Sequence, residues 1–91
     1  MTEITHSDDL FQFPCDFPIK ILGRCVPELA QTIVAAILQY APDYDPLTTE
    51  MRTSNQGTYL SLTCTIRAHS RDQLNQLYSV LSQHPLVTMV L

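Results

Sequence analysis

The clearest structural signal in the chain lies in residues 58–68, which read TYLSLTCTIRA. Apolar side chains occupy every second position from Leu60 to Ala68, and mostly polar side chains fill the positions between them. A period of two residues predicts a β-strand that turns one face to a core and leaves the other face open. The β-branched threonines of this segment suit a pleated, partly exposed surface.

A helix and a last strand are predicted after this segment. Ser70 and Gln73 have the spacing of a capping box, whose side chains bond the free backbone N–H groups at a helix start. An apolar stripe then repeats at helical spacing through Leu74, Leu77, Tyr78 and Leu81. Pro85 predicts that this helix ends near Gln83. Residues 86–91 predict a strand with apolar side chains on both of its faces.

The same kinds of pattern come before residue 58. Residues 17–25 alternate between apolar and polar side chains and predict a half-buried strand. Pro27 and Glu28 suit the first turn of a helix that runs through Ala41 and that Pro42 ends. The remaining predicted elements are a loop at 43–46, a strand over 47–53 and a turn at 54–57.

The element order β-α-β-β-α-β predicts an α+β fold, the ferredoxin-like sandwich. This fold has a four-stranded antiparallel sheet in the order 4-1-3-2 and both helices on one face. Right-handed crossovers are expected for its parallel connections. The apolar faces of residues 86–91 suggest a central strand, whereas this order places that strand at an edge. Pairing of two copies at this edge would cover it, so we expect a homodimer.

The charges are distributed unevenly along the chain, whose net charge is −4. Residues 1–16 carry four carboxylates and no base, while residues 17–91 carry five of each. We therefore expect a mobile acidic arm over residues 1–12 and a single folded domain over residues 13–91. A neutral domain poor in charge argues against binding of nucleic acid or an anionic membrane surface, and it favours self-association.

The sequence predicts a cytoplasmic protein. Its first nine residues have no basic region followed by an apolar one, as a secretory signal would. Its longest apolar run is residues 33–38, far shorter than the roughly 20 residues that a membrane span needs. Three cysteines are an odd number with no close pair, which favours reduced thiols over a disulfide framework.

Several short motifs along the chain resemble the YbeD-like family of small bacterial proteins. They are Phe13-Pro14, Phe17, Lys20, Gly23, Pro27-Glu28-Leu29, Ala41-Pro42, Tyr44, the turn from Ser54 to Gly57, Tyr59, Ser61 and Val87-Thr88-Met89-Val90-Leu91. The resemblance covers about residues 11–91. It implies a ferredoxin-like domain similar to ACT domains, which dimerise, bind amino acids and regulate enzymes. It carries over no catalytic or binding residues.

The residues favour no catalytic, metal or cofactor chemistry. Acyl-phosphate hydrolysis is a remote alternative, because it needs a cradle of backbone N–H groups after the first strand, and Pro27 has none to donate. Only Cys25 stands where a metal-carrying domain of this fold would need two thiols. No histidine lies at ligand spacing from another histidine or a cysteine. We therefore expect a protein that is not an enzyme and that holds no cofactor.

Two binding hypotheses remain. The first is an interaction module that binds an unknown protein partner through the open face of the sheet. Its candidate residues are Lys20, Tyr59, Thr63 and Arg67, on a face predicted to include Leu22, Arg24, Thr65, Thr88 and Val90 as well. The second is an ACT-like sensor of a small metabolite, in which a helix start receives a carboxylate at a dimer interface. Its candidate residues are Gly23, Arg24, Pro27 and Glu28.

Overall fold

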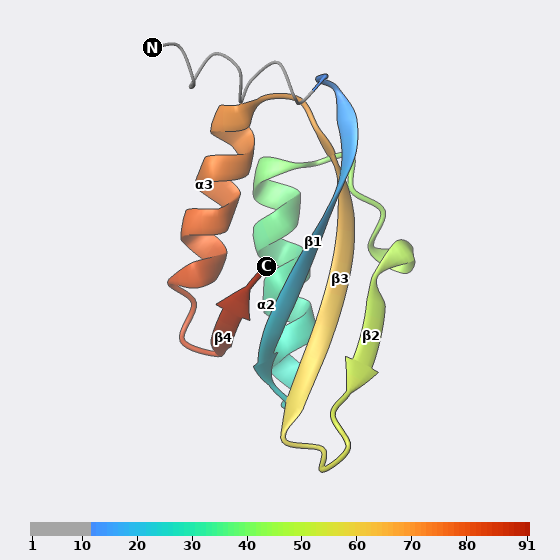
Figure 1. Cartoon of the computed structure of the whole chain (residues 1–91), viewed down its shortest axis with the longest axis vertical. Helices are drawn as coiled ribbons and strands as arrows, with labels where there is room; N and C mark the ends of the chain where they lie inside the picture. The colour runs from blue at the N-terminus through green and yellow to red at the C-terminus, as the bar shows by residue number, and fades with distance from the viewer. Residues whose placement is uncertain (1–11) are drawn as a thin grey trace.

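The computed structural model describes residues 12–91 and has the predicted ferredoxin-like architecture (Figure 1). The elements in chain order are β1 (Cys15–Arg24), α2 (Pro27–Tyr40), the 3₁₀ helix η1 (Pro46–Thr48), β2 (Glu50–Thr53), β3 (Tyr59–Ala68), α3 (Arg71–Ser82) and β4 (Val87–Val90). The sheet order is β2-β3-β1-β4, and every neighbouring pair is antiparallel. Both the α+β class and the predicted strand order are confirmed. The predicted acidic arm lies, except for Gln12, outside the described residues.

The core lies between the sheet and the two helices. Its fully buried large side chains come from both layers: Ile19, Ile21, Leu62, Cys64 and Ile66 from the sheet, and Leu29, Ile33, Ile37, Leu77 and Leu81 from the helices. The alternation in the strands and the apolar stripe after Ser70 predicted the buried positions of the sheet and of α3. Within the part of the chain that the structure describes, no helix covers the opposite face of the sheet, and most of its side chains are exposed or half-buried (Figure 1).

The Gln73 side chain, in the first turn of α3, forms a hydrogen bond to α2. The Ser70 hydroxyl caps α3 by accepting from the Gln73 N–H at 3.1 Å, as the capping box predicted. The Gln73 amide oxygen accepts from the His69 N–H at 2.6 Å. Its amide nitrogen donates to the carbonyl of Tyr40 at 2.8 Å, in the last turn of α2. Gln73 therefore fastens the start of α3 to the end of α2.

β2 is shorter than the predicted strand over 47–53. Pro46 fixes the backbone at the first position of η1, and the Asp45 carboxylate accepts from the Leu47 N–H at 3.0 Å. This local bond holds Leu47 and Thr48 in a helical turn, and the strand begins only at Glu50. β1, in contrast, begins earlier than predicted, at Cys15 rather than at residue 17.

β4 lies at an edge of the sheet, so the central position suggested by its apolar side chains is wrong. Its register against β1 shifts between Leu22 and Gly23, which marks a β-bulge. The bulge allows Val87 and Val90 both to pack against the core, while the two residues between them are exposed. The two valines of β4 therefore pack against the core of the same chain, while Met89 stays exposed.

Candidate functional site

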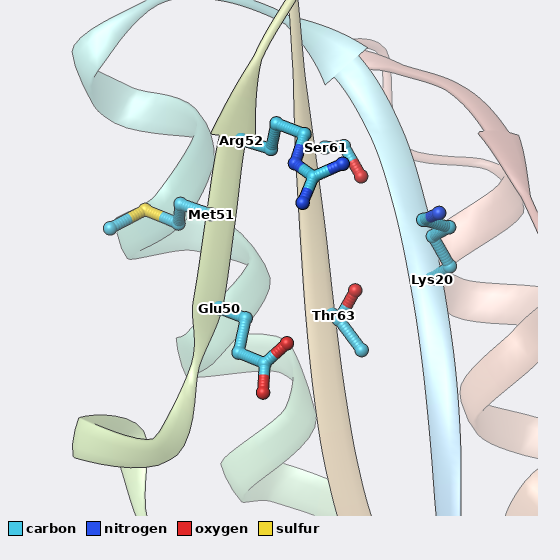
Figure 2. Close-up of a pocket in the computed structure, with 6 residues that line it drawn as sticks. All are labelled: Lys20, Glu50, Met51, Arg52, Ser61 and Thr63. Atoms are coloured by element: carbon cyan, nitrogen blue, oxygen red, sulfur yellow. The ribbon is translucent and has the colours of Figure 1, made fainter.

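The open face of the sheet has a hollow of about 270 Å³. Figure 2 shows the six residues that line it: Lys20, Glu50, Met51, Arg52, Ser61 and Thr63. The strand register explains how they meet. Thr63 lies opposite Lys20 of β1 on one side and Glu50 of β2 on the other, and Ser61 lies opposite Arg52. Three strands thus bring two cations, one carboxylate and two hydroxyls to one small area.

Positive charge is concentrated on this open face. Four of the five lysine and arginine side chains of the protein lie on this face, because they stand at outward-facing positions of the strands: Lys20, Arg24, Arg52 and Arg67. Two carboxylates, Asp16 and Glu50, share the face, so its formal charge is +2. The rest of residues 12–91 carries one cation and four carboxylates, a formal charge of −3. The open face of the sheet is therefore positive, while the helices and loops together carry a net negative charge.

Most of these cations are not neutralised by ion pairs. Arg67 contacts the Asp16 carboxylate at 3.1 Å, but both side chains are well exposed, so the pair contributes little to stability. Within residues 12–91, Lys20, Arg24 and Arg52 form no ion pair. All three are exposed. Their charges are available to an anionic group from outside the domain.

The structure places all four residues predicted for the partner face on the open side of the sheet. Lys20 and Thr63 are direct cross-strand neighbours, and Tyr59 lies opposite Arg24. Arg67 lies farther along β3 with Asp16. The prediction that Val90 belongs to this face is wrong, because the β-bulge places Val90 opposite the fully buried Ile21. Met89 takes its place: it lies opposite Leu22 and is 48% exposed.

Glu50 and Arg52 were not predicted as site residues. A sequence signal for them existed, because they alternate within the predicted strand over 47–53 just as Lys20 and Arg24 alternate in β1. That alternation shows that two side chains share a face. It does not show which residues of a neighbouring strand lie beside them, since this depends on the pairing register.

The turn predicted to hold a small metabolite uses its backbone for internal packing. Gly23 is buried, and a Cβ atom there would lie 2.6 Å from the Leu86 carbonyl oxygen and 2.9 Å from Leu29 Cδ1. The N–H groups of Arg24 and Cys25 donate to Leu86 and Thr58. Gly23 thus allows segments of the same chain to approach closely.

The other residues of this turn have structural positions of their own. Pro27 begins α2, and Glu28 is exposed in its first turn. Arg24 is exposed on the open face of the sheet. Binding of a metabolite at this turn stays a prediction.

The buried titratable groups of the domain are held in their neutral forms. Burial raises the pKa of the Cys64 thiol and of the Tyr44 phenol above their ordinary values. The Tyr44 hydroxyl is hydrogen bonded to the Thr49 hydroxyl, just before β2. A protonated, buried thiol is a poor nucleophile, so Cys64 acts here as a core residue. Among residues 12–91, no three His, Cys, Asp or Glu side chains gather as a metal site would require.

Solved structures similar to this chain share its fold. The C-terminal domain of the MgtC protein from Mycobacterium tuberculosis matches with a TM-score of 0.65 and 17% identity, over 89% of this chain and 88% of that one. The ACT domain from the GTP pyrophosphokinase of Chlorobium tepidum matches with a TM-score of 0.57 and 22% identity, over 85% and 97%. At these identities the likeness shows the fold alone, and the expected similarity to ACT domains is confirmed.

Helices of the described residues are too short, or too polar, to cross a membrane.

Relatives with similar sequences place the chain in a family. A UPF0250 protein of Nitrosomonas europaea is 51% identical over 84 residues, which is 92% of this chain and 97% of that protein. A UPF0250 protein of Bordetella pertussis is 48% identical over the full length of both chains. The family model described as "Protein of unknown function (DUF493)" matches residues 8–91. The YbeD-like resemblance is thereby confirmed, and the chain belongs to the DUF493/UPF0250 family of small bacterial proteins.

Proposed function

We propose that this protein is a non-catalytic regulatory or interaction module that binds an acidic surface of a partner protein through the open face of its sheet. The observation that carries the proposal is the concentration of four of the five cations on this face, in a chain whose net charge is −4. Complementary potentials guide two proteins into the right orientation and raise the rate of productive encounter.

The shape and chemistry of the face support a protein as its ligand. The hollow between Lys20, Arg52 and Thr63 has a volume of about 270 Å³ and a mostly polar and charged lining. It is therefore small and polar compared with the mostly apolar pockets that hold metabolites, and it suits a single carboxylate side chain. Tyr59, which is 41% exposed beside Arg24, adds an aromatic surface of the type enriched at protein interfaces. Serine and threonine hydroxyls between the cations offer further hydrogen bonds to a carboxylate.

The test compares two variants that lower the net charge by the same amount. Lys20→Gln with Arg24→Gln removes two charges from the open face. Asn75→Asp with Gln76→Glu adds two carboxylates to exposed positions of α3, on the helix side. The full-length wild type and both variants are immobilised, and the proteins that each retains from a lysate of the source bacterium are quantified by mass spectrometry at low and high salt.

We expect the open-face variant to retain at least ten times less of the acidic partner proteins than the wild type does. The α3 variant should retain as much of them as the wild type. Retention by the wild type should fall as salt rises, because exposed charges are screened. Equal retention by the two variants would show that the open face is not the binding site. Neither variant alters β2, so the result does not depend on how copies of the chain associate.

A further inference from the structure

The free edge of β2 is the most exposed part of the sheet. All four residues of β2 are exposed, and among residues 12–91 the strand pairs with β3 alone. The Ser54 N–H donates to the Tyr59 carbonyl at 2.9 Å, so Ser54 points its peptide groups toward β3. Peptide groups alternate in direction along an antiparallel strand. Those of Met51 and Thr53 therefore point outward, toward whatever lies beyond the edge.

The side chains of β2 form a pattern that is complementary to itself. Glu50 and Arg52 lie on the open face, on either side of Met51, which points away from them (Figure 2). Within residues 12–91, neither Glu50 nor Arg52 forms an ion pair. When a second copy of β2 pairs antiparallel about a two-fold axis at Met51, each Glu50 lies directly opposite Arg52 of the other copy. Two ion pairs then form across the edge.

The charges also select one register among the alternatives. Moving the axis to Glu50 sets two carboxylates opposite each other, and moving it to Arg52 sets two guanidinium groups opposite each other. Like charges directly opposite in a sheet are destabilising. The Met51 register also lets the outward N–H and carbonyl groups of Met51 bond the same groups of the second copy. Of the two axes that the outward peptide groups allow, at Met51 and at Thr53, only the one at Met51 sets each Glu50 opposite an Arg52.

An apolar groove on the helix side of the same edge supports this arrangement. The groove has a volume of about 440 Å³ and lies between α2 and β2, with Ala30, Val34, Ala35, Leu38, Pro46 and Met51 among its lining residues. Met51, which lines the groove, is 60% exposed, and Leu47, which follows the lining residue Pro46 in the chain, is 93% exposed. A second copy brings the same apolar groups to the two-fold axis, so each copy covers the groove region of the other.

We infer that the protein forms a homodimer by antiparallel pairing of β2 with β2 of a second copy, centred on Met51. The two sheets join into one of eight strands, with all four helices on the same side. The interface is isologous, as in most homodimers. This inference shares Arg52 with the proposed binding face, but it rests on the pairing pattern of β2 and not on the charge of that face. It moves the expected dimer contact from the β4 edge to the β2 edge.

Charge reversal tests the ion pairs directly. We expect Glu50→Arg and Arg52→Glu each to be monomeric, because each sets like charges opposite each other twice. The double variant Glu50→Arg/Arg52→Glu restores both pairs and should dimerise like the wild type. An equimolar mixture of the two single variants should form heterodimers, since their charges are complementary. Sedimentation equilibrium of the full chain measures each state, and circular dichroism confirms that each variant is folded.

Two further variants separate edge pairing from other modes of association. Met51→Pro removes an N–H that points outward, so β2 can keep its bonds to β3 while the dimer is lost. Lys20→Glu changes the charge by the same amount as Arg52→Glu, but on an inner strand, and should stay dimeric. A wild type that is monomeric at millimolar concentration would overturn the inference. It would also be overturned if both single variants dimerised as the wild type does, or if their mixture formed no heterodimer.

Discussion

The two edge strands of the sheet are both four residues long, yet they differ in how they are held. β4 packs Val87 and Val90 against the core, and just beyond it Leu91 exchanges two backbone hydrogen bonds with Lys20, at 2.8 and 3.1 Å. β2 exposes every residue and has an apolar groove beside it. An edge strand that packs against the core, as β4 does, stabilises the single chain. An edge strand whose residues are all exposed, as in β2, is available for pairing with another chain.

The largest difference is expected between a core residue of β1 that lies opposite β4 and an exposed residue of β2. Ile21 is fully buried and lies opposite Val90, so Ile21→Ala should lower the free energy of unfolding by about 2–5 kcal/mol. Met51→Ala removes an exposed side chain from β2 and should change the stability of the monomer by less than about 0.5 kcal/mol. Urea unfolding at a protein concentration that keeps the chain monomeric measures both. Similar losses would mean that β2 is as much a part of the core as β4 is.

The next largest effect is expected at Gly23, which lies very close to the backbone of Leu86 just before β4. A Cβ atom in Gly23→Ala would meet the Leu86 backbone oxygen, which cannot rotate away, so we expect a loss of about 1–3 kcal/mol. Gly57, in the hairpin after β2, is the matched control because nothing lies within 4 Å of its Cβ position. Its φ of +75° alone should make Gly57→Ala cost about 1 kcal/mol. Thermal unfolding of the two variants checks the order, and a milder effect at Gly23 would contradict the packing argument.

The smallest effect appears at alkaline pH. Burial raises the pKa of Cys64 above its ordinary value of 9.0, so the folded chain holds this proton more tightly than the unfolded chain. Below pH 9 both states are protonated and stability does not depend on this group. Above pH 9 the unfolded thiol ionises first, and stability should fall by at most about 1.4 kcal/mol per pH unit. Cys64 is fully buried in the core and lies opposite Ile19 of β1.

A control separates the titration of Cys64 from that of Tyr44 and of the partly buried Tyr78. Burial also raises the pKa of Tyr44 and Tyr78 above the ordinary value of 10.0, so their contributions begin about one pH unit higher. Cys64→Ala should therefore flatten the stability profile between pH 9 and 10 and leave the decline above pH 10. Urea unfolding across this range measures the profile. An unchanged slope in the variant would assign the effect to other groups.

Most of the fold could be predicted because local patterns and tertiary packing agree in these segments. β3 alternates without interruption, and the apolar stripe of α3 begins at a proper cap on Ser70. The predictions failed where a local bond or a bulge overrides the pattern. Asp45 holds Leu47 in a helical turn before β2. The bulge opposite Leu22 changes which residues of β4 face the core.

The candidate site could be predicted only in part. Alternation placed Lys20 and Thr63 on the open face, and the structure shows them as cross-strand neighbours. Glu50 and Arg52 join them only through the pairing of β2 with β3, a property of register that no single segment contains. The self-complementary charges of β2 become visible only when the direction of its peptide groups is known.

The side chain of Gln73 has a consequence for how the domain opens. It bonds the His69 N–H with its oxygen and the Tyr40 carbonyl with its nitrogen, and Tyr40 and Gln73 are 33 residues apart in the chain. Fraying of the last turn of α2 therefore breaks a bond that also orders the start of α3. The two helices should protect their amide protons from exchange as one cooperative unit, while β2, which shares none of these bonds, opens separately.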